Sequence, residues 1–219
     1  KEKPPFAAAV ADARAALALS KKASEVEMVL IRALCKNKEY QEAIERLTEL
    51  LKANPTDTKL LLRRAKAHSG ELNFLACIED ADIVIKLNRG SSAAYQLRAK
   101  AFFNLHQFPA AIADLKQAVA FSNKGLAQLQ FHLGQAHLQL GDAKAAREYF
   151  SNAIKAEYKK PESLLESARC ANALNRHPEA HQDITLALQL EKSPAAFLLR
   201  AQTFRLERKW EQAVSALDE

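Results

Sequence analysis

The sequence predicts an all-α fold, an α-solenoid of stacked antiparallel helix pairs, on the basis of three observations. The 219 residues include 42 Ala and 31 Leu but only 5 Gly and 7 Pro, a composition that favours helices and leaves little material for strands. Hydrophobic residues make up 48% of the chain, which is enough to bury a core and excludes a disordered protein. Six segments of about 34 residues also share one pattern, and repeats of that length indicate stacked helix pairs.

The chain divides in order into the parts of a single predicted array. Residues 1–23 fit a second helix whose partner first helix is missing. Full repeats are expected at 24–57, 58–91, 92–126, 127–160 and 161–193, followed at 194–219 by a sixth repeat that stops before its second helix should finish. Because repeat arrays normally close with polar caps, we expect a segment of a longer protein, whose other parts are among its partners.

Two positions in each repeat hold small side chains, which allow two helices to cross closely. Counted from the first residue of each repeat, position 20 holds Ala43, Cys77, Ala111, Ala146, Ala180 and Ala213. Position 8 holds Ala65, Ala99, Gly134, Ala168 and Ala201, with the larger Ile31 in the first repeat. Large apolar residues at positions 17 and 24 are expected to pack around them: Tyr40, Phe74, Phe108, Trp210, Leu47, Leu115, Phe150, Ile184 and Leu217.

Prolines mark where the helices begin. Pro161 and Pro194 open first helices, while Pro109 and Pro178 fall where second helices should start. Proline is well tolerated there because the first backbone N–H groups of a helix have no partner within it. Ser193, directly before Pro194, is a predicted N-cap.

With these features the repeat resembles the tetratricopeptide repeat, a helix-turn-helix unit of 34 residues. The fourth repeat carries the resemblance most fully, in Leu133, Gly134, Gly141, Asp142, Ala146, Phe150 and Ala153. The resemblance implies a right-handed superhelix whose first helices line a concave groove. Members of the family usually bind extended or helical segments of partner proteins in that groove.

No pattern in the sequence predicts catalysis or a cofactor. The five glycines are isolated, so there is no phosphate-binding loop. His177 and His181 have a spacing that could hold a metal ion, but they occupy packing positions of the repeat, and we expect part-buried side chains instead. Cys77 is likewise expected to be a small core residue. We therefore predict no catalytic residue, no metal site and no cofactor.

The net charge and the absence of targeting signals indicate the cellular location that we expect for the protein. The net charge is +6, from 32 Lys and Arg against 26 Asp and Glu. The longest apolar stretch, residues 6–19, is interrupted by Asp12 and Arg14, so no membrane span is predicted. The chain shows no secretory pattern, and we expect a cytoplasmic protein.

Arginines recur at position 7 and aspartates at position 23, a pattern that suggests ion pairs between packed helices. The arginines are Arg64, Arg98 and Arg200, and the aspartates are Asp80, Asp114 and Asp183. We interpret them as bridges that stabilise the stack rather than as contacts to a ligand. The sequence leaves open which arginine meets which aspartate.

The predicted groove concentrates the positive charge. On a helical period its positions hold eight bases against three acids, a net charge of +5 that lies in the first three repeats. We expect apolar side chains to be exposed between the bases, so that the groove fits an acidic segment with apolar anchors. The predicted partner-binding residues are Arg32, Lys59, Leu62, Arg63, Lys66, Leu97, Lys100, Phe103, Phe131 and Arg169.

The leading hypothesis is therefore a non-catalytic scaffold that binds a partner protein, and two alternatives stay open. One is a client-binding module of a co-chaperone. It would lack the family's carboxylate clamp, because the corresponding places hold Met28, Arg32, Arg63, Ala93 and Leu97. The other is an RNA-binding solenoid, which the modest charge and the few aromatic residues available for stacking disfavour.

Overall fold

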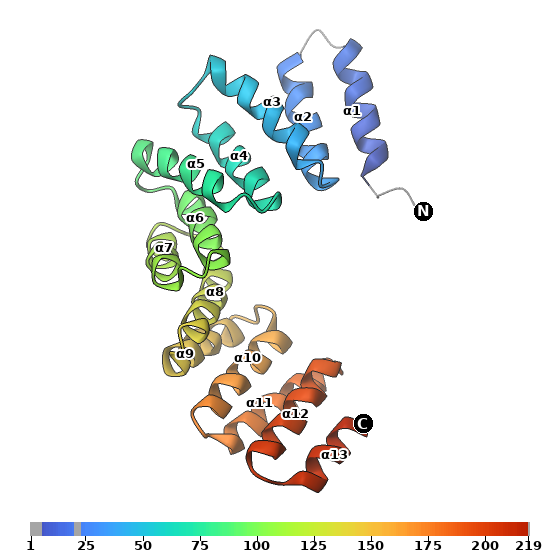
Figure 1. Cartoon of the computed structure of the whole chain (residues 1–219), viewed down its shortest axis with the longest axis vertical. Helices are drawn as coiled ribbons and strands as arrows, with labels where there is room; N and C mark the ends of the chain where they lie inside the picture. The colour runs from blue at the N-terminus through green and yellow to red at the C-terminus, as the bar shows by residue number, and fades with distance from the viewer. Residues whose placement is uncertain (1–5, 20–22, 219) are drawn as a thin grey trace. The chain divides into compact units, whose positions relative to one another are not determined.

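The computed structural model describes residues 6–19 and 23–218, and within them the chain is all-helical (Figure 1). Thirteen α-helices occur in this part of the chain: α1 (Ala7–Leu19), α2 (Ala23–Lys36), α3 (Tyr40–Ala53), α4 (Thr58–Gly70), α5 (Phe74–Leu87), α6 (Ser92–Asn104), α7 (Phe108–Ala120), α8 (Leu126–Gln139), α9 (Ala143–Lys155), α10 (Lys160–Ala173), α11 (His177–Leu190), α12 (Pro194–Leu206) and α13 (Trp210–Asp218). The even-numbered helices are the first helices of the predicted repeats, and the odd-numbered helices from α3 onward are the second helices. The predicted all-α fold is confirmed.

The helices form two compact units, unit 1 at residues 1–107 and unit 2 at residues 108–219. The boundary falls between α6 and α7, the two helices of the third repeat. In unit 1, α1 packs against α2, and each helix from α2 to α5 packs against the next. Unit 2 shows the same sequential packing from α7 to α13. The single array expected from the sequence stays a prediction, because each unit is defined by its own internal packing.

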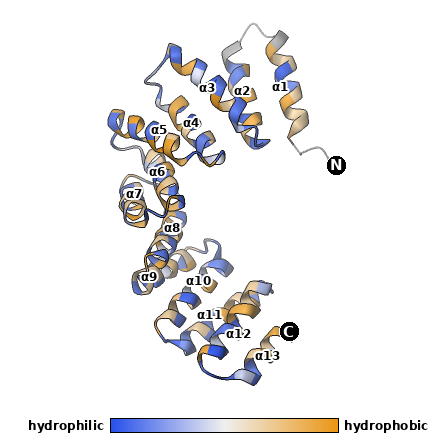
Figure 2. Cartoon of the chain, viewed as in Figure 1, coloured by the Kyte–Doolittle hydropathy of each residue, from blue (hydrophilic) through white to orange (hydrophobic). Residues whose placement is uncertain are grey.

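The first five repeats bury the small residue of position 20, whereas Ala213 of the sixth repeat is only partly buried. Ala43, Cys77, Ala111, Ala146 and Ala180 of position 20 are fully buried, and Figure 2 shows hydrophobic and hydrophilic residues interspersed along the helices. At Gly134 a Cβ atom would lie 2.8 Å from the ring of Phe150, closer than packed carbon atoms approach. Glycine is therefore needed at this position for α8 to pack as closely as it does against α9.

The last helix departs from the expected packing. Leu47, Leu115, Phe150 and Ile184 are buried at position 24, but Leu217 is 59% exposed and Trp210 is 61% exposed. In the preceding repeat, Ile184 packs with residues of the following first helix, α12. No described helix follows α13, so the prediction that Trp210 and Leu217 supply packing is wrong for this structure.

The helix ends follow the predicted local chemistry. The Ser193 hydroxyl accepts a hydrogen bond from the backbone N–H of Ala196, which makes it the N-cap of α12. Pro161, Pro178 and Pro194 lie in the first turns of α10, α11 and α12. None of the helices in the described residues combines the length and the hydropathy needed to cross a membrane.

The arginine and aspartate positions do join packed helices, as predicted. Arg64 of α4 donates from Nε and Nη2 to the carboxylate of Asp80 in α5, at 2.9 and 2.7 Å. In the fifth repeat, where position 7 holds Ser167 instead of arginine, the serine hydroxyl donates to Asp183 at 2.7 Å. In these two repeats position 7 bonds to position 23 of the same repeat, whereas Arg98 of the third repeat pairs with Asp82, at position 25 of the preceding repeat.

Candidate functional site

Six basic side chains share the first helices of unit 1. Arg32 and Lys36 are four residues apart on α2. Three of the four bases of α4 follow the spacing i, i+4 and i+7, which places them along one side of that helix. Lys100 adds a further charge from α6, which packs against α4. We call this set the basic face of unit 1: Arg32, Lys36, Lys59, Arg63, Lys66 and Lys100.

Electrostatic contacts link the bases of neighbouring helices. Burial raises the pKa of the Cys35 thiol on α2, while the charges of Lys66 and Arg63 on α4 act in the opposite direction. The bases of α4 are therefore close to the partly buried thiol of α2. The ammonium group of Lys36 lies 5.4 Å from the ring centre of Phe6, the residue directly before α1. The basic face thus extends across adjacent helices of one compact unit.

The six bases of this face have no ion-pair partner among the described residues. Four arginines of unit 1 outside this face are paired with acids of packed helices or neighbouring turns: Arg14 with Glu39 and Glu42, Arg46 with Glu27 and Glu42, Arg64 with Asp80, and Arg98 with Asp82. Acidic side chains are thus directed to the arginines between helices, and the charge of the basic face is left uncompensated. Such a surface attracts anionic groups.

The predicted apolar anchors are more buried than the sequence suggests. Leu62 and Leu97 are only partly exposed, because Leu62 packs on a cluster that includes Val84 and Leu97 packs on a cluster that includes Cys77. Phe103 is also only partly exposed. These three residues contribute apolar surface at the margins of the basic face rather than projecting anchors.

Phe131 is a core residue, and the expectation of an exposed aromatic anchor at this position is wrong. It is 4% exposed, and its ring makes edge-to-face contacts with Phe150 and Tyr158, with centroids 5.6 and 5.9 Å apart. The ammonium group of Lys159 covers it at 5.5 Å from the ring centre. The loop that brings Tyr158 and Lys159 onto α8 could not be read from the helical period, which describes only residues within helices.

The corresponding face of unit 2 is compensated. Arg169 on α10 is 53% exposed and pairs with Glu166 at 3.4 Å. Burial raises the pKa of Glu166, and the charge of Arg169 acts against that rise. Unit 1 contains 18 Lys and Arg against 13 Asp and Glu, and unit 2 contains 14 against 13. The structure therefore brings together the predicted bases of unit 1 and gives Arg169 a separate, paired environment.

The two histidines that could have suggested a metal site have other partners. His177 hydrogen-bonds to the side chain of Asn172 at 3.2 Å, and His181 lies 2.8 Å from a carboxylate oxygen of Glu207. The His181 ring also packs on Phe204, with centroids 4.5 Å apart. Within the described residues, no three His, Cys, Asp or Glu side chains group closely enough to hold a metal ion.

Sequence reasoning missed the position of Cys35. It falls on a predicted groove position, but no motif surrounds it, and only the structure shows the charges of Arg63 and Lys66 acting on its thiol. The other two cysteines, Cys77 and Cys170, are fully buried, and burial raises their pKa values to about 11 and about 12. The buried Cys77 confirms its predicted role as a small core residue.

Comparison with known proteins gives both family and relatives. A family model described as tetratricopeptide repeat matches residues 6–58, 96–150 and 131–196. DnaJ homolog subfamily C member 7 of Mus musculus is 26% identical over 157 residues, which cover 70% of this chain and 31% of that protein. The TPR repeat-containing thioredoxin TDX of Arabidopsis thaliana is 35% identical over 79 residues, 36% of this chain and 21% of that protein. The chain spans less than a third of the length of these curated relatives.

Solved structures with this fold share little sequence with the chain. PilW, a type IV pilus biogenesis factor, superposes with a TM-score of 0.76 at 14% identity, covering 90% of this chain and 91% of that one. YrrB, described as a TPR protein with an unusual peptide-binding site, gives a TM-score of 0.67 at 17% identity, covering 78% and 89% of the two chains. These likenesses show the fold alone.

Proposed function

Because the chain belongs to the tetratricopeptide repeat family, we propose that it is a non-catalytic scaffold whose basic face in unit 1 binds an acidic segment of a partner protein. Proteins of this family generally serve as binding scaffolds rather than enzymes. The observation that carries the proposal is the contrast within unit 1, where the arginines between helices are paired and the six bases of the basic face have no ion-pair partner among the described residues.

Uncompensated charge determines what kind of partner fits. Bases spread over α2, α4 and α6 attract an acidic segment from a distance, raise its association rate and disfavour basic competitors. Leu62, Leu97 and Phe103 are partly exposed, and they add limited apolar contact once the segment is bound. The partner is therefore selected mainly by charge, with apolar side chains in a supporting role.

A charge-reversal experiment tests this proposal. The probe is a fluorescently labelled synthetic peptide that alternates Glu and Leu, and the readout is its fluorescence anisotropy. The combined variant Arg63→Glu, Lys66→Glu and Lys100→Glu should weaken binding at least about tenfold. Helical content, measured by circular dichroism, should stay unchanged.

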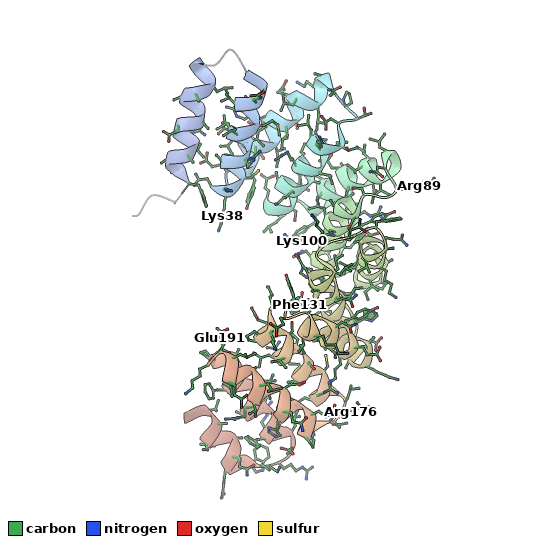
Figure 3. The ribbon with its side chains drawn as sticks, turned by 180° about the vertical axis from the view of Figure 1, so that it is seen from behind. Lys38, Arg89, Lys100, Phe131, Arg176 and Glu191 are labelled. Carbon is green, nitrogen blue, oxygen red and sulfur yellow. The ribbon has the colours of Figure 1, made fainter. Side chains whose placement is uncertain are left out.

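A matched control distinguishes the effect of the basic face from the effect of the protein's net charge. Lys38, Lys86 and Arg89 are exposed bases of unit 1 outside the basic face, without ion-pair partners in the described part of the chain. Figure 3 shows Arg89 and Lys100 on different sides of the unit. Reversing the three control charges to Glu should change affinity by less than about threefold. Equal losses in the two triple variants would contradict the proposal.

A second candidate, a client-binding module of a co-chaperone, is favoured by one comparison. The similarity to DnaJ homolog subfamily C member 7 covers 70% of this chain. Under this alternative the chain should slow the aggregation of a heat-denatured test protein such as luciferase, and the charge-reversal triple variant should do so equally well. Failure to slow aggregation would leave the scaffold proposal intact and remove the alternative.

A further inference from the structure

A cleft of about 680 Å³ lies within unit 2, away from the predicted binding residues. The second helices α9 and α11 form its walls and each packs against α10, whose residues Leu164 and Ser167 line the floor. Arg176, which also lines the cleft, lies on the opposite side of the unit from Glu191 (Figure 3). The cleft is therefore lined mainly by residues of second helices, whereas the basic face of unit 1 consists of residues of first helices.

The repeat register explains why space is left here. In the second repeat, Arg64 at position 7 fills the corresponding place, donating to Asp80 and, at 3.1 Å, to the hydroxyl of Thr48. Ser167 at position 7 of the fifth repeat bonds to Asp183 in the same way but is much shorter. Arg147 of α9 pairs with Glu179 and reaches Asp183 at 3.7 Å, and beside the short Ser167 side chain a cleft remains that Arg147, Ser167 and Asp183 line.

The lining combines unpaired positive charge with apolar surface. Lys144 and Lys155 are exposed and have no ion-pair partner among the described residues. Arg176 is 55% exposed, and its contact with Glu179 is long, at 3.9 Å.

The acidic groups of the lining offset little of this charge. Glu148 is exposed, and Asp183 is already engaged by Ser167 and Arg147. The apolar surface comes from the buried Leu164, the partly buried Ile154 and Leu174, and Leu186, which is 50% exposed.

We propose that this cleft is a second protein-binding site, which takes an apolar side chain flanked by carboxylates from a segment of a partner protein. The apolar side chain contacts the floor at Leu164 and Leu174, and the carboxylates pair with Lys144, Lys155 and Arg176 at the rim. Apolar burial supplies affinity, and the surrounding bases select an acidic segment. This inference does not depend on the basic face of unit 1.

The test uses a chain whose basic face is already reversed by Arg63→Glu, Lys66→Glu and Lys100→Glu, so that an acidic peptide can report on the cleft. The probe is a labelled nine-residue peptide with a central Leu flanked by two Glu on each side, compared with the same peptide carrying Lys in place of Glu. The acidic peptide should bind at least about tenfold more tightly than the basic one. Equal binding of the two peptides would overturn the proposal.

Two further variants locate the binding. Ser167→Arg introduces the side chain that position 7 carries in Arg64, Arg98 and Arg200, and it should close the cleft and weaken the acidic peptide at least about tenfold. The double variant Lys144→Glu and Lys155→Glu changes only exposed rim residues, so it tests the cleft even if Ser167→Arg alters folding. It should weaken the acidic peptide by the same factor.

The matched control is the double variant Lys124→Glu and Lys192→Glu, at exposed lysines of unit 2 outside the cleft. It should keep full affinity for the acidic peptide. Binding that survives the Lys144 and Lys155 reversal would overturn the proposal.

Discussion

The guanidinium group of Arg64 shows how a single residue joins the repeats. It bonds to Asp80 of its own repeat and to Thr48 of the preceding one. Asp80 is 3% exposed, so its charge is tolerated only because the arginine compensates it in a buried setting. Residues of this kind hold successive helices in register and leave the basic face to interact with other molecules.

Removing the carboxylate should therefore be costly. Asp80→Ala leaves Arg64, whose side chain is only 21% exposed, without its counter-charge, and we expect a loss of about 3 kcal/mol in the free energy of unfolding. Urea denaturation measures this loss. Glu49→Ala is the control, because Glu49 and its partner Lys52 are both 69% exposed, and such pairs contribute less than about 1 kcal/mol. Similar losses in both variants would contradict the assigned role of Asp80.

His68 makes stability depend on pH. Burial lowers its pKa, and its Nδ1 atom is buried without a hydrogen-bond partner in the described part of the chain. Because the unfolded state binds this proton more readily, the contribution of His68 to stability is present above its unfolded pKa and is lost as the pH falls through its folded pKa. His68→Phe, which introduces the residue found at this position as Phe102 and Phe204, should reduce the loss of stability between about pH 7.5 and 5.5. Equal losses in the variant and the parent would show that His68 is not responsible.

At the scale of helices, one turn recurs in all six repeats. The residue at position 15, between the first and second helix, has a positive φ angle in Lys38, Leu72, His106, Gly141, Asn175 and Arg208. Only the fourth repeat places glycine there, although glycine is the residue that adopts this conformation without strain. The chain thus tolerates a strained residue in five turns because the packing of the adjoining helices fixes their geometry.

Exchanging residues at this position should shift stability in opposite directions. Leu72 has φ 67° and is 71% exposed, so Leu72→Gly relieves strain without losing much packing and should stabilise the protein by about 0.5–1 kcal/mol. Gly141 has φ 86° and open space around it, so Gly141→Ala should destabilise by about 1 kcal/mol through backbone strain alone. Thermal unfolding distinguishes the two changes, and a destabilising Leu72→Gly would contradict the strain assignment.

The sequence predicts helices better than it predicts exposure. Helix order and packing follow from the small residues at positions 8 and 20, because close crossing is a local requirement that every repeat must satisfy. Phe131 was misplaced because its cover comes from Tyr158 and Lys159 in a loop. Among the candidate bases, the period correctly grouped those of α4, but whether each has a counter-charge depends on side-chain geometry that the period does not contain.

At the scale of the whole molecule, the helices are shared between two compact units, but the net positive charge lies mostly in one of them. The chain forms two compact units that meet in sequence between α6 and α7. Most of the net positive charge belongs to unit 1, which contains 18 bases and 13 acids, whereas unit 2 is nearly balanced.

Binding of an acidic segment to unit 1 should accordingly weaken about tenfold or more when the salt concentration rises from about 50 to 500 mM, because exposed charges are screened. Isothermal titration calorimetry with the Glu and Leu peptide measures this, and a salt-independent affinity would contradict a charge-selected partner.

Alkylation of Cys35 by iodoacetamide, followed by mass spectrometry, tests the central claim most directly. Cys35 is partly exposed among the bases of α2 and α4, whereas Cys77 and Cys170 are fully buried, so the reagent should modify Cys35 first. A saturating acidic peptide, its binding verified by anisotropy, should slow this reaction at least about fivefold by covering the basic face of unit 1. An unchanged rate of Cys35 alkylation while the peptide is bound would place the partner elsewhere on the protein.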